Sequence, residues 1–554
     1  MRRVLLAVGA AALVAAGALA ILGRGAAPPA ALAVPPEERL LLSFEAAAVD
    51  GISELRFRGR DAALEGPGAE GFEDVSIEVH APLPPAAGQR FYVRSQIGRP
   101  QVSVMETPGV SNAQTLRLRI DDARKPGPAP LRFELVAAPV RDAPNPKNVV
   151  IVTLDSLRAD RLGVSGYGRP TTPNLDAFAA ESVRFTNAFS TSSFTPPSHA
   201  SLLTSRWVGH HGLLTWNALP AEQLTLPEIL SRYGYRTGAS VNLQLLSGQG
   251  LGQGVAWQRE GLRDGSGIVR EALEFMQEEP GRPFFLWLHF YDVHRPYKRP
   301  TDVVGGYGRY EPVSFGDVNE DYNLEPEDVE ERGLGADALR YVSDRYDNGV
   351  IYTDTLLAPL LAALAAPERR ADTLVILTAD HGESLLEHPE RLFSHDPFLL
   401  SVVTRIPLLM RYPGAAAAGS VRSELVSLVD LAPTVLEVLG VDAPASFEGK
   451  SLVGLNDGRP FARDVVFQEA WGWSQQKAAR SAGRLVVHDA EADETRAYDL
   501  ATDPSERSPK PTSLAAKSGL EAALAAFASR EDPQAAPELS PELVEQLEAL
   551  GYVD

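Results

Sequence analysis

The chain has 554 residues, of which 44% are hydrophobic and 23% are charged, as in folded proteins large enough for two or more domains. Its formal charge of -21 argues against nucleic acid or an anionic membrane surface as the main partner, although a bound cation can make a local site attractive to an anionic substrate. The absence of cysteine excludes disulfides, thiolate metal sites and any residue made from cysteine.

The first 36 residues have the pattern of an export segment followed by a linker. Arg2 and Arg3 precede an uncharged apolar run at 4–22, and small residues with a candidate cleavage site at 31–33 follow it. The run is also long enough to span a bilayer. We therefore expect an exported protein, periplasmic or otherwise extracytoplasmic, with either a cleaved signal peptide or a transmembrane anchor.

Residues 37–143 contain short alternating runs of apolar and polar residues, separated by Gly, Pro and Asp. The runs lie at 40–44, 54–57, 75–79, 91–93, 115–120 and 131–136. This spacing predicts a β-sandwich-like domain. Such a domain either binds carbohydrate or packs against the rest of the chain, and the absence of a group of aromatic residues favours packing.

Residues 144–460 alternate between strand-like apolar runs and helical patterns. The strand-like runs lie at 148–154, 236–241, 283–290, 373–378 and 406–412. The alternation predicts a mostly parallel sheet covered by helices, in which ligands bind at the carboxyl ends of the strands. Residues 461–554 are expected to complete this domain with a small antiparallel sheet, from runs at 465–467, 485–487 and 497–500, and a tail helix at 541–552.

Two of the predicted strands end in groups that can bind a metal. Asp155 follows the first run, and Asp380 and His381 follow the run at 373–378. Between them Thr195 precedes Pro196, a residue suited to the first position of a helix, which predicts Thr195 at the N-cap beside unpaired amides. Taken singly, such residues are more often caps or turn residues. Together, two carboxylates, an imidazole and a hydroxyl suit one divalent cation (Mg, Mn, Ca or Zn), which would lower the pKa of the hydroxyl.

Nine short motifs between residues 146 and 510 resemble, in order, those of the sulfatase family of the alkaline phosphatase superfamily. They lie at 155–160, 172–176, 289–297, 346–348, 380–383, 394–395, 405–409, 430–434 and 498–504. The resemblance implies an alkaline-phosphatase-like sandwich of helices around a mostly parallel sheet. It also implies roles for individual residues. The implied metal ligands are Asp155, Thr195, Asp380 and His381, with Thr195 also the nucleophile, and the implied contacts to the transferred group or its leaving oxygen are His294 and His395.

Histidines outside these positions are better explained as structural residues. His289 is expected to be a packing residue at the end of a strand. His210 and His211 are expected to have structural roles in a loop after the nucleophile helix.

Three departures from the family pattern bear on the substrate. The family segment normally begins with a Cys that becomes formylglycine, whereas this chain has Thr195 there and His199 in place of an Arg. Ser156 stands where many sulfatases have a second Asp, so one ligand is lost. Asn242 and Gln244 stand at the Lys-x-His pair of arylsulfatases, so Asn242 is expected to contact the substrate without the cationic grip on a sulfate.

The sequence thus predicts a metal-dependent hydrolase, or transferase, of phosphoric or sulfuric esters that forms a covalent intermediate on Thr195. A phosphoester is favoured, because a threonine ester cannot expel sulfate by collapsing to an aldehyde. The resemblance to members with a Thr nucleophile implies a small-molecule, lipid or glycan ester as the substrate. Two alternatives stay open: a sulfuric ester hydrolase without formylglycine, and a non-catalytic binding protein that keeps the fold.

Overall fold

The computed structural model describes residues 142–529 except 216, 221–222, 243–244, 246–248, 262–263, 296, 298–335, 386, 389–394, 396 and 473, and before residue 142 it describes the backbone of eight strands. The chain forms two compact units. One consists of Met1–Asp142, Pro220–Gly234 and Leu246–Trp257, and the other of Ala143–Leu219, Tyr235–Leu245 and Gln258–Asp554. The division into four segments expected from the sequence stays a prediction.

The eight N-terminal strands form two four-stranded sheets, in the orders β1-β4-β7-β6 and β3-β2-β8-β5. Their bounds are β1 Val4–Leu6, β2 Arg39–Ala48, β3 Ile52–Gly59, β4 Asp74–Ala81, β5 Gln89–Gln96, β6 Gln101–Thr107, β7 Gln114–Asp121 and β8 Leu131–Pro139. All six predicted runs fall inside these strands.

Within the described residues, the structure contains no helix that is both long and apolar enough to cross a membrane. The expected export segment therefore stays a prediction.

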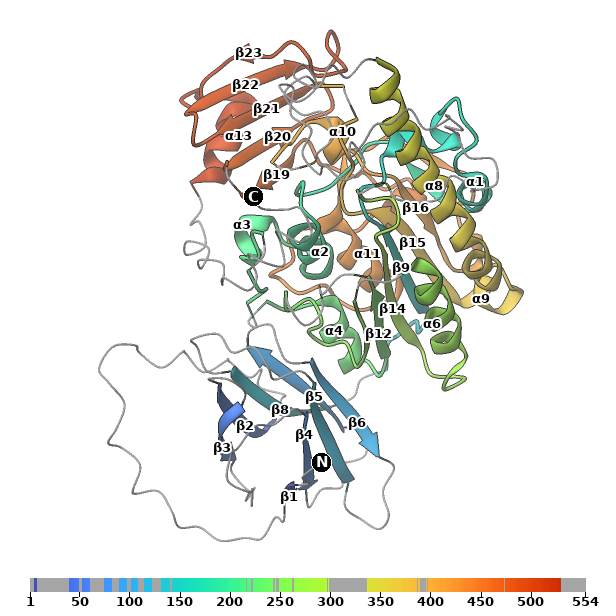
Figure 1. Cartoon of the computed structure of the whole chain (residues 1–554), viewed down its shortest axis with the longest axis vertical. Coiled ribbons are helices and arrows are strands. Elements are labelled where there is room, and N and C mark those ends of the chain that lie inside the picture. Colours follow the sequence, from blue (N-terminus) through green and yellow to red (C-terminus); the bar gives the residue numbers. More distant parts are fainter. Residues whose placement is uncertain are drawn as a thin grey trace. The chain divides into compact units, whose positions relative to one another are not determined.

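The second unit is built around an eight-stranded sheet with the order β13-β12-β14-β9-β15-β16-β10-β17 (Figure 1). Its strands are β9 Asn148–Leu154, β10 Val183–Phe185, β12 Arg236–Val241, β13 Trp257–Arg259, β14 Phe284–Phe290, β15 Thr373–Ala379, β16 Leu408–Arg411 and β17 Val421–Arg422. The neighbours β12, β14, β9 and β15 are mutually parallel and every residue in them is buried. Burial on both faces explains why these strands read as continuous apolar runs. The run at 406–412 contains β16, which is antiparallel to β15.

Helices cover both faces of this sheet. Figure 1 shows α1, α6, α8 and α9 on one side and α2 and α11 on the other. The bounds are α1 Pro173–Ala180, α2 Thr195–Thr204, α3 Val208–His211, α4 Leu226–Arg232, α6 Gly265–Gln277, α8 Ala336–Leu364, α9 Pro367–Asp372, α10 Ser401–Thr404, α11 Leu431–Val438, α12 Val453–Asn456 and α13 Gly519–Ala528. Gly238 on β12 lets α6 approach closely, because a Cβ there would lie 2.6 Å from the Phe275 ring. The predicted fold class is confirmed.

The C-terminal region forms the expected small antiparallel sheet. Its strands, in spatial order, are β19 Val466–Ala470, β20 Gln476–Arg480, β21 Arg484–Asp489, β22 Glu494–Asp499 and β23 Lys510–Pro511. Leu524 and Phe527 of α13 pack on Val466, Ala479 and Val486 of this sheet. The tail helix expected at 541–552 lies outside the described residues. Two short strands, β11 Ala188–Phe189 and β18 Val426–Ser427, pair separately.

Candidate active site and metal centre

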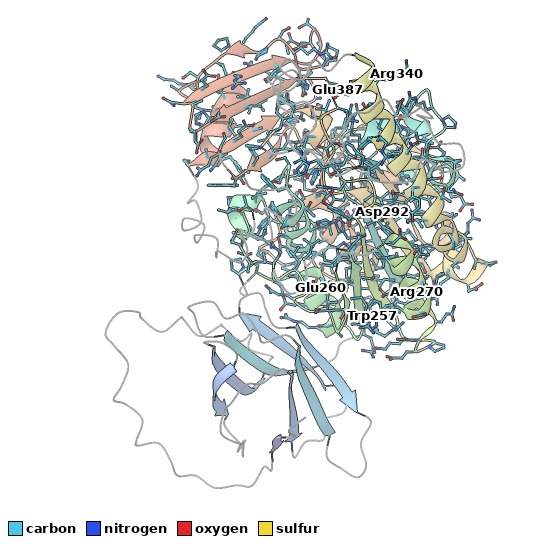
Figure 2. The ribbon with its side chains drawn as sticks, viewed as in Figure 1. Trp257, Glu260, Arg270, Asp292, Arg340 and Glu387 are labelled. Carbon is cyan, nitrogen blue, oxygen red and sulfur yellow. The ribbon has the colours of Figure 1, made fainter. Side chains whose placement is uncertain are left out.

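The site lies at the carboxyl ends of the three central parallel strands. Asp155 directly follows β9, Asp380 directly follows β15, and His289 is the last but one residue of β14. Because β14 and β15 flank β9 and end in register with it, all three side chains reach the same edge of the sheet. Side chains fill the space around this edge, and Asp292, just beyond β14, lies in the interior (Figure 2).

Hydrogen bonds from Ser156 and His381 orient both carboxylates. Asp380 Oδ1 accepts hydrogen bonds from the backbone N–H of Ser156 at 3.2 Å and of His381 at 2.8 Å, whereas Asp380 Oδ2 is buried without a hydrogen-bond partner. Ser156 Oγ donates to Asp155 Oδ1 at 2.9 Å. Ser156 has a φ of 58°, a conformation that costs energy in a residue other than glycine and that is often found at functional sites. Ser156 therefore positions the carboxylates on either side of it, a role that sequence reasoning missed.

Thr195 meets these groups at the start of α2. Its Oγ1 lies 3.2 Å from His381 Nε2 and 3.4 Å from Asp155 Oδ2. His381 Nδ1 donates to the carbonyl oxygen of Gly382 at 2.9 Å, so the neutral ring presents the Nε2 lone pair to Thr195. A Cβ on Gly382 would lie 2.5 Å from the carbonyl oxygen of Val402, so this position after His381 requires glycine.

The prediction that Thr195 is an N-cap is wrong by one residue. The helix begins at Thr195, and the N-cap is Phe194, whose φ of -115° and ψ of 143° are extended. The first bond of this turn runs from the N–H of Ser198 to the carbonyl of Phe194. Periodicity does not settle a helix boundary to one residue, whereas the backbone hydrogen bonds do.

The residues present fit a divalent cation. Asp155, Asp380 and His381 each offer one ligand atom within 4.8 Å of the others, and all three are buried. Buried carboxylates need a compensating charge, and the unpartnered Asp380 Oδ2 marks where such a charge would sit. The structure thus brings together all four residues predicted as metal ligands, and their roles stay predictions.

His294 and His395 form a second group beside this centre. Their Nε2 atoms face each other at 3.2 Å, and the His395 ring stacks on that of His381 with centroids 4.2 Å apart. The Nδ1 of His395 donates to the carbonyl of Ser193 at 2.8 Å, and that of His294 donates to the carbonyl of Arg295. Burial lowers the pKa of both rings well below the usual histidine value. The structure thus places the pair beside His381, and its expected contact with the transferred group stays a prediction.

Asn242 connects two strand ends. Its Oδ1 accepts from the N–H of Tyr291 at 2.8 Å, and its own N–H donates to the carbonyl of His289 at 3.4 Å. The Tyr291 ring stacks on His294 with centroids 4.2 Å apart. Asn242 therefore supports the segment after β14 that carries Tyr291 and His294. Its expected contact with the substrate stays a prediction, and Gln244 lies outside the described residues.

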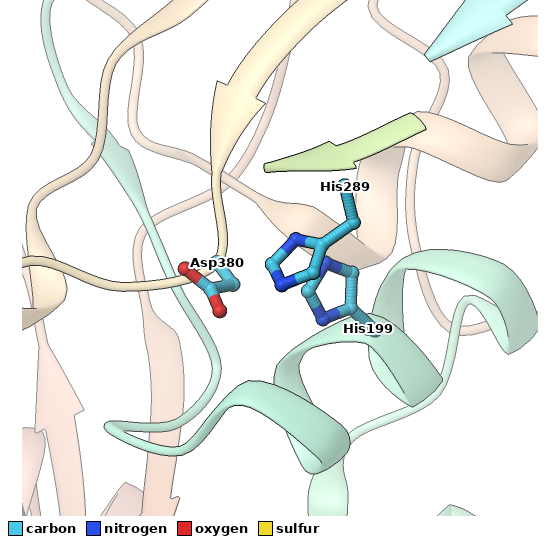
Figure 3. A group of neighbouring side chains, drawn as sticks. All are labelled: His199, His289 and Asp380. Carbon is cyan, nitrogen blue, oxygen red and sulfur yellow. The ribbon is translucent and has the colours of Figure 1, made fainter. Parts of the chain in front are cut away.

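Sequence reasoning missed the part that His199 and His289 play near the metal centre. Both are buried, and together with Asp380 they form a second group of ligand atoms within 4.8 Å of one another (Figure 3). Their ring centroids are 4.6 Å apart, and burial lowers the pKa of His199 to about 3 and that of His289 to about 4. The available sequence signal was the position of His289 at the end of a buried parallel strand.

Comparisons with known proteins identify the family of the chain. The sulfatase family model matches residues 147–250 and 265–441, and a model described as N-sulphoglucosamine sulphohydrolase, C-terminal, matches residues 387–516. The chain is 24% identical over 488 residues to the N-acetylglucosamine-6-O-sulfatase of Bacteroides thetaiotaomicron, covering 69% of this chain and 87% of that one. It is 27% identical over 359 residues to the human N-acetylgalactosamine-6-sulfatase, covering 57% of this chain and 65% of that one.

Among solved structures, the phosphonate monoester hydrolase of Agrobacterium radiobacter has the same fold, with a TM-score of 0.56 and 19% identity over 69% of this chain and 94% of that one. A structure in complex with its substrate D-glucosamine-2-N,6-O-disulfate matches with a TM-score of 0.53 and 20% identity, over 65% of this chain and 92% of that one. The sulfatase model alone covers half of the residues. The chain therefore belongs to the sulfatase family and is a sulfatase-like ester hydrolase.

Proposed function

We propose that the chain is a metal-dependent hydrolase, or transferase, of phosphoric or sulfuric esters, with a phosphoester as the favoured substrate and Thr195 as the nucleophile. One observation carries this proposal: Thr195 Oγ1 lies 3.2 Å from His381 Nε2 and 3.4 Å from Asp155 Oδ2, in a chain without cysteine. A hydroxyl beside these two candidate ligands supports Thr195 as the nucleophile, and no cysteine is available to make formylglycine.

The residues of the metal centre would hold one divalent cation between Asp155, Thr195, Asp380 and His381. When bound there, the cation supplies positive charge that favours the ionised Thr195 hydroxyl and the anionic ester. The two buried carboxylates that would surround it are already oriented: Asp380 by the backbone N–H groups of Ser156 and His381, and Asp155 by the Ser156 hydroxyl.

Thr195 then attacks the phosphorus in line. The bond from its Oγ1 to phosphorus forms as the bond from phosphorus to the leaving oxygen breaks, which gives a phosphothreonine ester. Water, or an acceptor alcohol in a transferase, attacks the same phosphorus and releases the Thr195 hydroxyl. A threonine ester of sulfate has no aldehyde route of release, which favours phosphorus over sulfur as the attacked atom.

The pair His294 and His395 is placed to assist the leaving oxygen. Both Nδ1 atoms donate to backbone carbonyls, so a hydrogen bond between the facing Nε2 atoms requires one proton shared by the two rings. Burial opposes that positive charge, and an anionic ester bound beside the pair stabilises it. The pair delivers its shared proton to the leaving oxygen, the proton of the Thr195 hydroxyl passes to solvent, and the pair takes up a proton from solvent before the next turnover.

A sulfuric ester hydrolase is the second candidate, because the similar curated proteins are an N-acetylglucosamine-6-O-sulfatase and an N-acetylgalactosamine-6-sulfatase. By analogy with these relatives, a glycan ester is the substrate class to test first. Parallel rates on matched aryl phosphate, aryl phosphodiester and aryl sulfate esters separate the two candidates. A rate that is highest on the sulfate would reverse our preference.

Thr195→Val tests the nucleophile, because valine keeps the shape of the side chain and removes the hydroxyl. We expect a loss of at least about 1,000-fold in kcat/KM on every accepted ester. Thr204→Val, which changes a buried threonine at the other end of α2, is the matched control and should retain activity. Mass analysis of the wild type after substrate addition should find a phospho- or sulfo-adduct on Thr195. Unchanged activity of Thr195→Val would refute the mechanism.

A further inference from the structure

We propose that His289 is a further ligand of the cation held by Asp155, Asp380 and His381. The inference rests on the proposed function, because it assumes a cation in that centre. It adds a second imidazole to the site and thereby narrows the class of metal. Three observations carry it: the hydrogen bonds of Thr153, the unpaired Nε2 of His289, and the spacing of the surrounding ligand atoms.

The Thr153 hydroxyl fixes the tautomers of the two histidines. His199 Nδ1 lies 2.8 Å from the carbonyl of Thr195 and must donate to it, so the Nε2 of the neutral ring accepts from the Thr153 hydroxyl at 3.0 Å. This bond uses the only proton of Thr153. Trp287 Nε1 at 3.1 Å and His289 Nδ1 at 3.0 Å must therefore donate to the Thr153 oxygen. A longer bond from Thr153 to the carbonyl of Leu288, at 3.3 Å, is the weaker alternative.

With Nδ1 as the donor, His289 presents the lone pair of Nε2 to the metal centre. This atom is buried and has no hydrogen-bond partner, although Asp155 Oδ2 lies only 3.2 Å away. The two atoms are close enough for a hydrogen bond but do not form one, because Asp155 Oδ2 does not lie along the direction in which an N–H on Nε2 would point. A proton on Nε2 would in any case leave Asp380 Oδ2 unpaired, whereas one divalent cation satisfies both atoms.

The distances between the polar atoms match those between ligands of one ion. Two ligand atoms that are each about 2.1 Å from a metal are roughly 3.0–3.4 Å apart at octahedral to tetrahedral angles. His289 Nε2 is 3.2 Å from Asp155 Oδ2, and Thr195 Oγ1 is 3.4 Å from that oxygen and 3.2 Å from His381 Nε2. The contacts of His381 Nε2 with Asp380 Oδ2, at 3.5 Å, and with Asp155 Oδ1, at 3.8 Å, are longer. His289 adjoins these ligand atoms through Asp155 Oδ2 and through Asp380, with which it and His199 form the second group.

His199 has a different part. Both of its ring nitrogens are engaged, with Thr195 and Thr153, so it positions the tautomer of His289 and the backbone of the nucleophile. The donor set then contains two imidazoles, two carboxylates and one hydroxyl. Imidazole nitrogen favours Zn²⁺ and other transition metals, and disfavours Ca²⁺ and Mg²⁺, which prefer oxygen. We therefore expect Zn²⁺ or Mn²⁺ to bind more tightly than Ca²⁺.

Ligand counting on the wild-type protein tests this inference without any variant. The metal-free protein is loaded with one equivalent of Mn²⁺, and pulsed EPR counts the nitrogen atoms coordinated to the ion. Two imidazole nitrogens, from His289 and His381, are expected. One coordinated nitrogen would overturn the inference and leave the proposed function intact, whereas failure to bind one equivalent of any divalent cation would overturn the proposed function itself.

Variants then assign the second nitrogen. His289→Gln should lower the affinity for Zn²⁺ at least about 100-fold, measured by chelator competition, and should leave one coordinated nitrogen. Thr153→Val, which removes the partner of His289 Nδ1, should lower the affinity for Zn²⁺ about 10-fold. His294→Gln changes a buried histidine of the neighbouring pair and should retain wild-type affinity. Equal Zn²⁺ affinity of His289→Gln and the wild type would also overturn the inference.

Discussion

Two pairs of buried histidines flank the metal centre, and they differ in what their ring nitrogens contact. In the pair His199 and His289, one hydroxyl, that of Thr153, bonds to both rings and orders their protons. In the pair His294 and His395, both Nδ1 atoms donate to backbone carbonyls, and the two Nε2 atoms are 3.2 Å apart. All four side chains are buried, so burial does not distinguish the pairs.

Nδ1 is the donor in all four rings, so the surroundings of Nε2 decide what each buried histidine can do. A fixed neutral tautomer leaves a lone pair directed at one point, which suits a metal ligand or its support. Two rings that share one proton suit proton transfer to a leaving group. The first pair is therefore expected to control metal affinity and stability, and the second to control turnover.

The largest effect that tests this division is expected at the second pair. His294→Gln should lower kcat about 100-fold, because the shared proton is lost, while the bound metal stays at the wild-type level. The double variant with His395→Gln should be little worse than the more damaging single one, since both rings serve one proton. Steady-state kinetics and metal analysis of the same preparations check this. Loss of metal from His294→Gln would contradict the division.

A smaller effect, on stability, is expected at the first pair. Thr153→Val removes the common partner of His199 Nε2, His289 Nδ1 and Trp287 Nε1, all of which are buried. Leaving such groups unpaired should lower the free energy of unfolding by about 2–4 kcal/mol. Denaturant unfolding of the metal-free protein measures this loss of free energy of unfolding. Thr353→Val on α8, a buried threonine bonded to one carbonyl, is the control with an expected loss of about 1 kcal/mol.

The last effect, on the pH dependence of stability, concerns a buried histidine outside both pairs. His211, which bonds to Ser201 Oγ at 3.0 Å, has a pKa lowered to about 3 by burial. The unfolded state, with a pKa of about 6.5, binds the proton first, so stability is highest above pH 6.5 and falls as the pH decreases toward 3. His211→Gln should reduce this slope between about pH 4 and 6 by at most about 1.4 kcal/mol per pH unit. An unchanged slope would contradict the burial argument, and His488→Gln on the C-terminal sheet is the control.

Sequence reasoning was accurate where a pattern depends on local periodicity. The run at 236–241 matches β12 in both bounds, and Asp155 and Asp380 follow their strands as expected. Periodicity did not predict β20, because Gln476 and Lys477 are polar and Ala479 is buried only by the packing of α13 on the sheet. Ser156 was interpreted only as the loss of a ligand, because the residue type alone predicts neither its positive φ nor its hydrogen bond to Asp380.

The sequence by itself determined the alternation of strands and helices in the central domain, the absence of a cysteine to form formylglycine, and the acids at the ends of two strands. These follow from composition and from apolar patterns that each segment carries alone. Only the tertiary structure decided which histidines meet the cation centre, because His289 reaches Asp155 through the parallel register of β14 with β9. Strand register and hydrogen-bond direction are properties of neighbouring segments, so no single segment of the sequence can specify them.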